Sequence, residues 1–210
     1  MKKKVVITDY TYENIDIERR ILTSVGADLQ DYQYREEYDV IKVAKDCDVL
    51  IVQYSKITRK VIEKLSNCKA IVRYAIGVDN IDLDAATEKG IYVVNVPDYG
   101  VDEVGTYAVT LLLAAARKLP QTIKSIEKKQ WDYSQLKPLY RTYGKKVGLI
   151  GFGKIPQDVA KKLSGFGFEI VAYDPYLDTE TIKQHNVIPI DLDELIETSD
   201  YISIHSPLTN

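Results

Sequence analysis

A mostly apolar run that ends in a glycine turn constrains this chain more than any other feature of its sequence. Residues 147–150 read as a buried strand, Gly151-Phe152-Gly153 follows, and a helical pattern begins near Ile155. In such a turn, backbone N–H groups point outward at a helix N-terminus, where they can bind a phosphate group. The pattern therefore predicts a dinucleotide-binding turn, in which Gly151 makes the sharp turn and Gly153 lets a pyrophosphate approach the backbone.

The residues after the turn extend this prediction. The N–H groups of Lys154 and Ile155 would face the anion. Pro156 stands where a third glycine is usual, and proline is tolerated there because its missing N–H has no helical partner in a first turn. Asp174 ends the next predicted strand, 23 positions after Gly151. Its carboxylate would bind both hydroxyls of the adenosine ribose and repel a 2′-phosphate, which favours NAD over NADP; the alternative is a solvated acid at a strand end.

The first part of the chain is predicted to be an α/β domain of its own. Short buried strands alternate with helical patterns from residue 1 to about 98, which indicates a doubly wound parallel sheet, with a flavodoxin-like strand order favoured. Thr58 and Asp82 are candidate helix N-caps, and Gly26 and Gly90 are candidate helix ends. The predicted strands are residues 5–7, 49–52, 70–72 and 91–94, and the predicted helices are 15–25, 58–65 and 83–89.

Residues 99–210 are predicted to form the first part of a Rossmann domain. They begin with a long helix, 101–119, that is apolar on most faces and is therefore expected to be buried between the two domains. A polar helix that ends near Trp131 and a loop over 132–143 precede the glycine turn. The remaining predicted strands are 147–150, 170–173, 187–188 and 201–204, with helices over 155–166, 179–184 and 192–197.

Composition excludes several classes of function. The formal net charge of -3 gives no electrostatic reason to expect nucleic acid or an anionic membrane as a partner. The longest apolar run, 108–116, is too short to span a bilayer. Cys47 and Cys68 have neither metal-ligand spacing nor a disulfide framework, a usage typical of the reducing cytoplasm. We therefore expect a cytoplasmic α/β protein without a metal site.

Four segments of the chain together resemble the D-isomer-specific 2-hydroxyacid dehydrogenases. They are residues 73–82 (RYAIGVDNID), 94–99 (VNVPDY), the glycine turn through Asp174-Pro175, and 205–209 (HSPLT). Their order and spacing are similar to the family across essentially the whole chain. The resemblance implies a first domain that contacts substrate and a second that holds NAD. It also implies hydride transfer between the nicotinamide and C2 of a D-2-hydroxy acid or 2-oxo acid.

The resemblance also implies which residues contact the substrate. Backbone N–H groups around Ala75, Ile76 and Gly77 would bind the substrate carboxylate, because a glycine-bearing turn can present adjacent donors to an anion. Ile76 would also face the nicotinamide. Tyr99 matches a position whose tyrosine contacts substrate in lactate-type members; the alternative is an aromatic residue that packs by its ring. Which 2-hydroxy acid is used is not specified by these residues.

The end of the sequence contributes cofactor contacts in this resemblance but no catalytic group. Ser206 and Pro207 would lie against the nicotinamide ribose. His205 belongs to the family's strand-end His-x-Pro segment and not to its catalytic histidine. The family's His–Glu pair and its arginine lie beyond that segment, so no residue of 1–210 is assigned as catalytic. Because general acid–base catalysis contributes about 10²- to 10⁴-fold, the chain alone is expected to lack turnover.

Three interpretations of the whole chain follow. The first is a fragment of a D-2-hydroxyacid dehydrogenase. The second is a non-catalytic NAD-binding module with a regulatory role, and the third is a remnant of a truncated gene. The family resemblance also implies a homodimer formed through the long apolar helix at 101–119.

Overall fold

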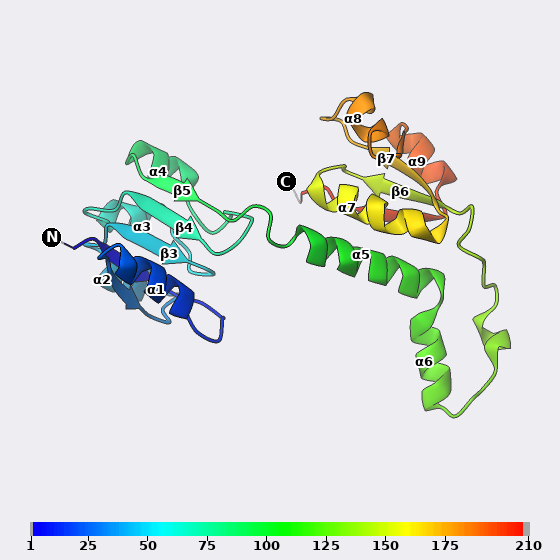
Figure 1. Ribbon diagram of the computed structural model, residues 1–210, viewed down its shortest axis with the longest axis horizontal. Helices are drawn as coiled ribbons and strands as arrows, with labels where there is room; N and C mark the ends of the chain where they lie inside the picture. Colours follow the sequence, from blue (N-terminus) through cyan, green and yellow to red (C-terminus); the bar gives the residue numbers. More distant parts are fainter. Residues whose placement is uncertain (1, 208–210) are drawn as a thin grey trace. The chain divides into compact units, whose positions relative to one another are not determined.

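The computed structural model describes residues 2–207 and divides the chain into two compact units (Figure 1). Unit 1 is Met1–Tyr99 and unit 2 is Gly100–Asn210. Each unit is an α/β structure built on its own parallel sheet. The predicted α/β fold class is confirmed.

The sheet of unit 1 has five parallel strands in the order β2-β1-β3-β4-β5. This is the flavodoxin-like order that was predicted. The inner strands are apolar on both faces because helices cover both sides: Val6 faces one buried cluster, whereas Val5 and Ile7 face another. The strands are β1 (Lys4–Ile7), β2 (Asp28–Asp31), β3 (Val49–Val52), β4 (Ala70–Arg73) and β5 (Tyr92–Val94).

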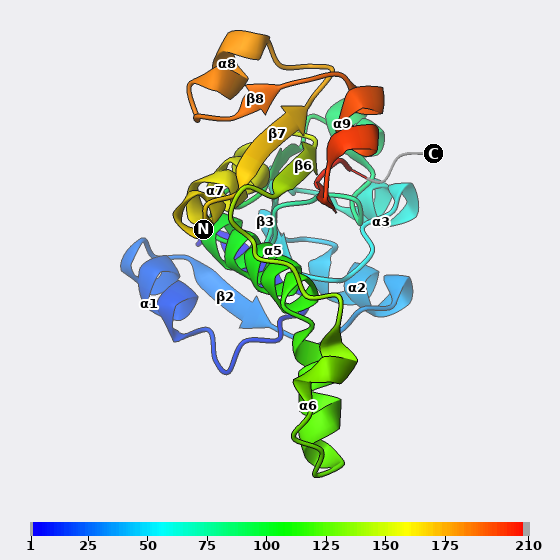
Figure 2. The same cartoon turned by 90° about the vertical axis from the view of Figure 1, so that its right-hand side faces the viewer.

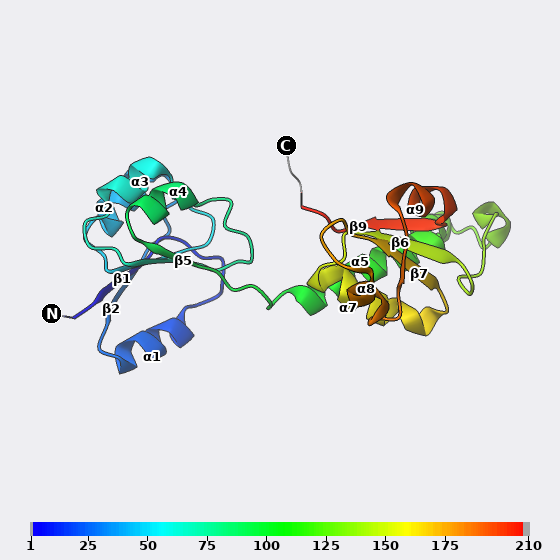
Figure 3. The same cartoon turned by 90° about the horizontal axis from the view of Figure 1, so that it is seen from above.

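The helices of unit 1 lie on opposite faces of this sheet. Helix α1 (Asp16–Ser24) covers one face, and the other three helices cover the opposite face (Figure 3). Those three are α2 (Glu37–Ala44), α3 (Arg59–Lys64) and α4 (Leu83–Glu88). Strand β2 and helix α2 were not predicted from the sequence.

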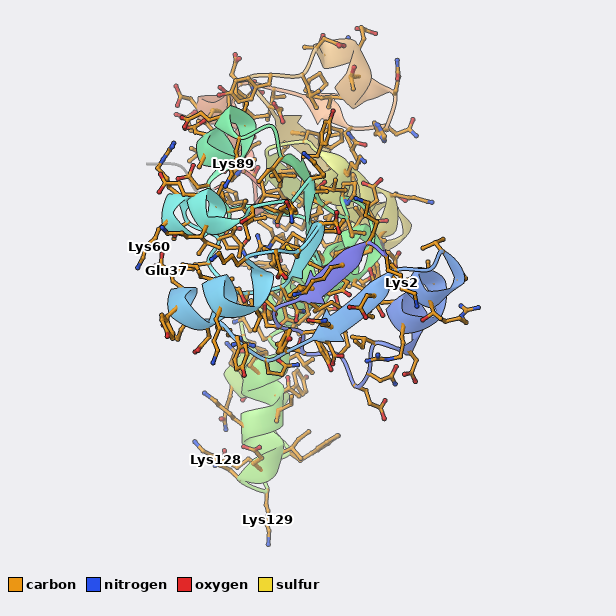
Figure 4. All side chains as sticks on the ribbon, turned by 90° about the vertical axis from the view of Figure 1, so that its left-hand side faces the viewer. Lys2, Glu37, Lys60, Lys89, Lys128 and Lys129 are labelled. Carbon is orange, nitrogen blue, oxygen red and sulfur yellow. The ribbon has the colours of Figure 1, made fainter. Side chains whose placement is uncertain are left out.

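The predicted helix caps of unit 1 differ in what they do. The Asp82 carboxylate accepts a hydrogen bond of 2.8 Å from a backbone N–H in the first turn of α4, as predicted for an N-cap. Thr58 precedes α3 but makes no cap hydrogen bond. Its hydroxyl instead donates to Glu37 of α2 at 2.5 Å, and Lys60 contacts the same carboxylate at 3.3 Å (Figure 4). Thr58 therefore joins two helices rather than capping one.

The sheet of unit 2 has four parallel strands in the order β8-β7-β6-β9. Numbered from the first strand of this sheet, the order is 3-2-1-4, the arrangement at the start of a Rossmann fold. The Rossmann-type fold predicted for this part of the chain is confirmed. The strands are β6 (Lys146–Ile150), β7 (Glu169–Tyr173), β8 (Ile188–Pro189) and β9 (Tyr201–Ile204).

Helices α5 and α7 pack against each other on one face of this sheet, and α9 contacts β6 and β7 on the other (Figure 3). Helix α6 with the 3₁₀ helix η1 projects from the body of unit 2 (Figures 1 and 2). The helical segments are α5 (Val101–Ala116), α6 (Leu119–Glu127), η1 (Tyr133–Leu136), α7 (Lys154–Leu163), η2 (Ser164–Phe166), α8 (Thr179–Lys183) and α9 (Leu192–Thr198).

The long helix predicted over 101–119 is corrected in two respects. It ends at Ala116, because Lys118 takes a left-handed conformation with φ of 52° and a new helix starts after it. It is also not buried all round. One face, with Gly105 and Val109, is buried in unit 2, whereas Tyr107 and Leu111 are 65% and 55% exposed.

Two further properties concern the part of the chain that the structure describes. None of its helices combines the length and apolarity that a bilayer crossing requires. Over residues 2–207, no three His, Cys, Asp or Glu side chains gather in a way that could hold a metal ion.

Candidate dinucleotide-binding site

Three segments of unit 2 meet at the carboxyl edge of its sheet. Strands β7, β6 and β9 are neighbours, and their register pairs Ile150 with both Tyr173 and Ile204. The residues that follow each strand therefore start at the same level of the edge. In open parallel sheets this edge is where ligands bind, at the point where the strand order reverses. Here that point lies between β6 and β9.

Gly151 is the residue that makes the turn after β6. Its φ is 85°, a conformation that side chains other than glycine rarely adopt, and its N–H donates to the Tyr173 carbonyl at 2.8 Å. A Cβ at this position would lie 3.1 Å from the carbonyl carbon of His205 and from the Ser206 nitrogen. Both the conformation and the close approach of the segment after β9 therefore require glycine.

Gly153 has a different environment. It is the N-cap residue of α7, with an ordinary φ of -72° and no side-chain cap hydrogen bond. A Cβ built on Gly153 would meet nothing within 4 Å. The space beside the start of α7 is thus open to a ligand, and the helix dipole favours an anion there. This geometry fits a bound pyrophosphate.

The Asp174 side chain is held against the glycine turn. One carboxylate oxygen accepts a hydrogen bond from the Phe152 N–H at 2.7 Å, and the other accepts one from the Tyr176 N–H at 2.9 Å. An ionised carboxylate offers about four acceptor positions, so two remain for other donors. Asp174 is therefore fixed at the mouth of the turn, where the hydroxyls of a ribose could reach it.

Two residues that the sequence analysis did not single out brace this turn. Phe152, the middle residue of Gly-x-Gly, is fully buried in the core of unit 2. The Gln157 side chain donates from Nε2 to the Phe152 carbonyl at 3.0 Å. Pro156, which replaces a third glycine, is also buried. The apolar character of Phe152 and Pro156 was the only feature of the sequence that indicated their burial. Nothing in the sequence indicated the contact of Gln157 with the turn.

His205 continues the edge after β9. Its N–H donates to the Ile150 carbonyl at 2.8 Å, and its Nε2 lies 2.9 Å from the Ser203 hydroxyl. Burial lowers the pKa of His205, so its ring is neutral near pH 7. Ser206 and Pro207 follow it and are exposed. Leu208 and Thr209, the end of the segment used for the resemblance, lie outside the described residues.

The predicted substrate-contacting turn of unit 1 follows strand β4. The Ala75 carbonyl accepts a hydrogen bond from Val96 at 3.1 Å, and the Ile76 carbonyl accepts one from the Asn95 side chain at 2.6 Å. These contacts join the turn 75–77, which includes Gly77, to the segment 94–99. Tyr99, at the end of that segment, is 60% exposed. Two of the four resemblance segments thus lie together, and the ligand roles of Ala75, Ile76, Gly77 and Tyr99 stay predictions.

A buried carboxylate organises the neighbouring loop of unit 1. Asp9 accepts hydrogen bonds from the Ser55 hydroxyl at 2.6 Å and the Tyr54 N–H at 2.8 Å, and Arg35 lies 3.5 Å away and over the Tyr54 ring. Burial acts to raise the pKa of Asp9, but the hydrogen bonds outweigh it and hold the pKa below its usual value. Asp9 was not identified from the sequence, because the Tyr54 and Ser55 groups that donate to it are 45 and 46 positions away.

Comparison with known proteins agrees with this geometry. Residues 109–210 match the sequence model of the D-isomer specific 2-hydroxyacid dehydrogenase NAD binding domain. The chain is 40% identical over 208 residues to D-3-phosphoglycerate dehydrogenase of Methanocaldococcus jannaschii, covering 98% of this chain and 39% of that protein. It is also 40% identical over 181 residues to hydroxypyruvate reductase of Thermotoga maritima, covering 84% of this chain and 57% of that protein.

Solved structures give the same result. The structure is similar to D-lactate dehydrogenase from Aquifex aeolicus, which was solved with NAD and lactic acid. The TM-score is 0.84 at 26% identity, covering 98% of this chain and 61% of that one. The apo-structure of D-lactate dehydrogenase from Escherichia coli matches with a TM-score of 0.76 at 29% identity, covering 98% and 66%.

The fold, the glycine turn and the matched domain define an NAD-binding α/β protein. The chain belongs to the D-isomer-specific 2-hydroxyacid dehydrogenase family, as the sequence analysis predicted. The predicted cofactor, NAD, is confirmed by the family domain and by the related structure that holds NAD. The chain spans 39% and 57% of the length of the two curated relatives named above.

Proposed function

We propose that this chain carries the substrate-contacting and NAD-binding parts of an oxidoreductase that interconverts D-2-hydroxy acids and 2-oxo acids. The observation that carries the proposal is the Asp174 carboxylate, held at 2.7 Å from the N–H of the glycine turn. The family and the names of the relatives, which include a glyoxylate reductase, support the class of substrate.

Each proposed residue has a physical role toward NAD. The cofactor, when bound, accepts or donates a hydride at its nicotinamide. The N–H groups of Lys154 and Ile155 would bind its pyrophosphate at the start of α7. Asp174 would bind the ribose hydroxyls through its remaining acceptor positions. Ser206 and Pro207 would lie beside the nicotinamide ribose, because the chain after β9 passes next to Gly151.

On the substrate side, we propose that the N–H groups of the turn 75–77 bind the carboxylate. Hydrogen bonds from Asn95 and Val96 to its carbonyls hold this turn in place, and a glycine-bearing turn can present adjacent N–H donors to an anion. Tyr99 is proposed as a substrate contact from its exposed ring in the adjoining segment.

We further propose that the 210-residue chain binds NADH without turnover on its own. Hydride transfer to a 2-oxo acid needs a group that delivers a proton to the carbonyl oxygen. Among residues 2–207, neither histidine is paired with a carboxylate: His205 contacts Ser203, and His185 packs edge-on against the Phe152 ring at 5.6 Å. An imidazole without a carboxylate partner lacks the orienting acid that a proton donor of this kind requires.

Calorimetric titration of the chain with NADH and NADPH tests this proposal. The wild-type chain should bind NADH and discriminate against NADPH. Asp174→Ala should weaken NADH binding by about 10- to 100-fold, because hydrogen bonds to a charged acceptor contribute about 1.5–3 kcal/mol each. Asp193→Ala removes an exposed acid from the first turn of α9 and serves as the matched control, with unchanged affinity.

The ratio of the two affinities separates ribose recognition from damage to the turn. If Asp174 binds the ribose, Asp174→Ala should lose NADH affinity while NADPH affinity stays the same or rises. A disturbed turn would weaken both cofactors equally. Absence of NADH binding by the folded wild-type chain would contradict the proposal, and so would reduction of a 2-oxo acid by this chain alone.

We also propose that the chain forms a homodimer and functions in the cytoplasm. Helices α5 and α6 of unit 2 carry exposed apolar side chains, among them Leu111 and Ile126, and Trp131 beyond α6 is 94% exposed. Exposed apolar side chains that form a patch are typical of subunit interfaces. Both cysteines are free thiols, which is typical of a reducing compartment.

A further inference from the structure

The two cysteines of the chain lie opposite each other on neighbouring strands. Strands β3 and β4 pair Val49 with Ala70, an offset of 21 residues. Hydrogen bonds before the strands keep this offset, since Lys69 and Ser66 donate to carbonyls 21 positions earlier at 2.8 and 2.7 Å. Cys47 and Cys68 are separated by the same interval. They therefore face each other at the amino ends of β3 and β4.

Both side chains point to the same face of the sheet. Cys47 and Cys68 belong to one buried cluster, on the side that α2, α3 and α4 cover. Neighbouring strands are about 4.8 Å apart. A disulfide needs Cα atoms about 4.4–6.8 Å apart. The register and the shared face place the two thiols next to each other, and each thiol interacts with the other.

The two thiols are not equivalent. The interaction with Cys68, and then burial, raises the pKa of the Cys47 thiol, whereas the Cys47 thiol lowers the pKa of Cys68. Cys47 is fully buried and Cys68 is 6% exposed. Because the thiolate is the nucleophile, Cys68 is the thiol that would react first.

We propose that Cys47 and Cys68 form a disulfide site, oxidised by a low-molecular-weight disulfide. The Cys68 thiolate attacks one sulfur of the external disulfide, whose S–S bond breaks and releases one thiolate. Cys47 then loses its proton to that thiolate and attacks the Cys68 sulfur, which releases the second half of the oxidant as a thiolate. Two protein sulfurs are oxidised and one external disulfide is reduced to two small thiols, so electrons and protons balance.

The cross-link would act on unit 1 alone. It closes a loop over residues 47–68, which contains β3 and α3. Closing a loop of this length lowers the unfolding equilibrium constant by about 300-fold. The site lies at the amino ends of the strands, whereas the turn 75–77 follows their carboxyl ends. NADH binding by unit 2 should therefore be the same in the reduced and oxidised chain.

The test is mass spectrometry of the native chain after incubation with oxidised glutathione. The intact mass should fall by about 2 Da as two thiols become one disulfide. Peptide mapping should place the link between Cys47 and Cys68, and dithiothreitol should restore the original mass. In Cys47→Ser, where the resolving thiol is removed and its hydrogen-bonding capacity is kept, a glutathione adduct should accumulate on Cys68. In Cys68→Ser the reaction should slow by at least about 10-fold.

Several results would overturn the proposal. These are an unchanged mass in the native chain, a link that joins two chains, a link that forms only in urea, and a glutathione adduct on Cys47. The wild-type mass and peptide map decide the matter even if a serine variant does not fold. Circular dichroism of the wild-type chain before and after oxidation establishes that the chain is folded in both states.

Discussion

At the scale of single residues, the glycines of the β6 region show that one residue type serves different physical purposes. Gly151 is required by its backbone conformation, and Gly153 leaves open space for a ligand. Gly148, inside β6, is required by packing, because a Cβ there would lie 2.5 Å from both the Leu195 side chain and the Ser199 hydroxyl. The sequence motif identifies only the first two.

Gly148→Ala should therefore destabilise unit 2. The added methyl group would collide with Leu195, which is fully buried, and overpacking of this kind costs about 1–3 kcal/mol. The measurement is the free energy of unfolding in urea. Gly165→Ala is the matched control, because a Cβ at Gly165 would meet nothing within 4 Å. Equal stability of the two variants would show that β6 and α9 are not packed as described.

The buried Asp9 carboxylate carries a pH prediction. Its folded pKa is lower than its usual value, so its contribution to stability is present above the unfolded pKa and is lost as the pH falls through the folded one. Asp9→Asn should cost about 1–3 kcal/mol at pH 7 by replacing a charged acceptor of several hydrogen bonds. Below about pH 4, stability should fall more steeply in the wild-type chain than in the variant. Parallel stability curves for the two proteins, from unfolding followed between pH 2 and 7, would refute this role.

At the scale of helices and strands, most elements of the chain could be predicted because their apolar residues follow a regular pattern. Strand β2 and helix α2 were missed because each carries a weak sequence signal. Strand β2 reads Asp-Leu-Gln-Asp, with one apolar residue, because an edge strand buries little. Helix α2 has only Val40 and Ala44 buried in two turns, and its N-cap residue, Glu36, makes no cap hydrogen bond.

The cap of α4 provides a test at this scale. Asp82→Ala removes the only side-chain acceptor at the start of this short helix and should cost about 0.5–2 kcal/mol in the free energy of unfolding. Asp84→Ala is the control, because Asp84 is an acid in the same turn that does not cap the helix. Thermal unfolding of the chain measures the change in stability that each of the two variants causes. A larger loss for Asp84→Ala than for Asp82→Ala would contradict the assignment.

At the scale of the whole molecule, the exposed apolar side chains of α5 and α6 predict whether the protein is a dimer or a monomer in solution. Leu111→Asp combined with Ile126→Asp should convert a dimer into a monomer, because both side chains are more than half exposed in the single chain. Sedimentation equilibrium measures the change. Lys128→Asp, at the polar end of α6, is a control for added negative charge and should remain dimeric (Figure 4). A wild-type chain that sediments as a monomer at about 50 μM would exclude this interface, because a dimer with a micromolar dissociation constant would be largely associated at that concentration.

The sequence alone determined most of the α/β elements, the glycine turn, the acid that follows β7 and the family. These features are local, since a backbone conformation or a helix start depends on residues a few positions apart. Only the tertiary structure decided that Asp174 contacts the Phe152 N–H, that Gln157 braces the turn, and that Cys47 faces Cys68. Those contacts depend on strand register and on which face of a sheet each side chain takes, and both are fixed by the packing of the whole unit rather than by neighbouring residues.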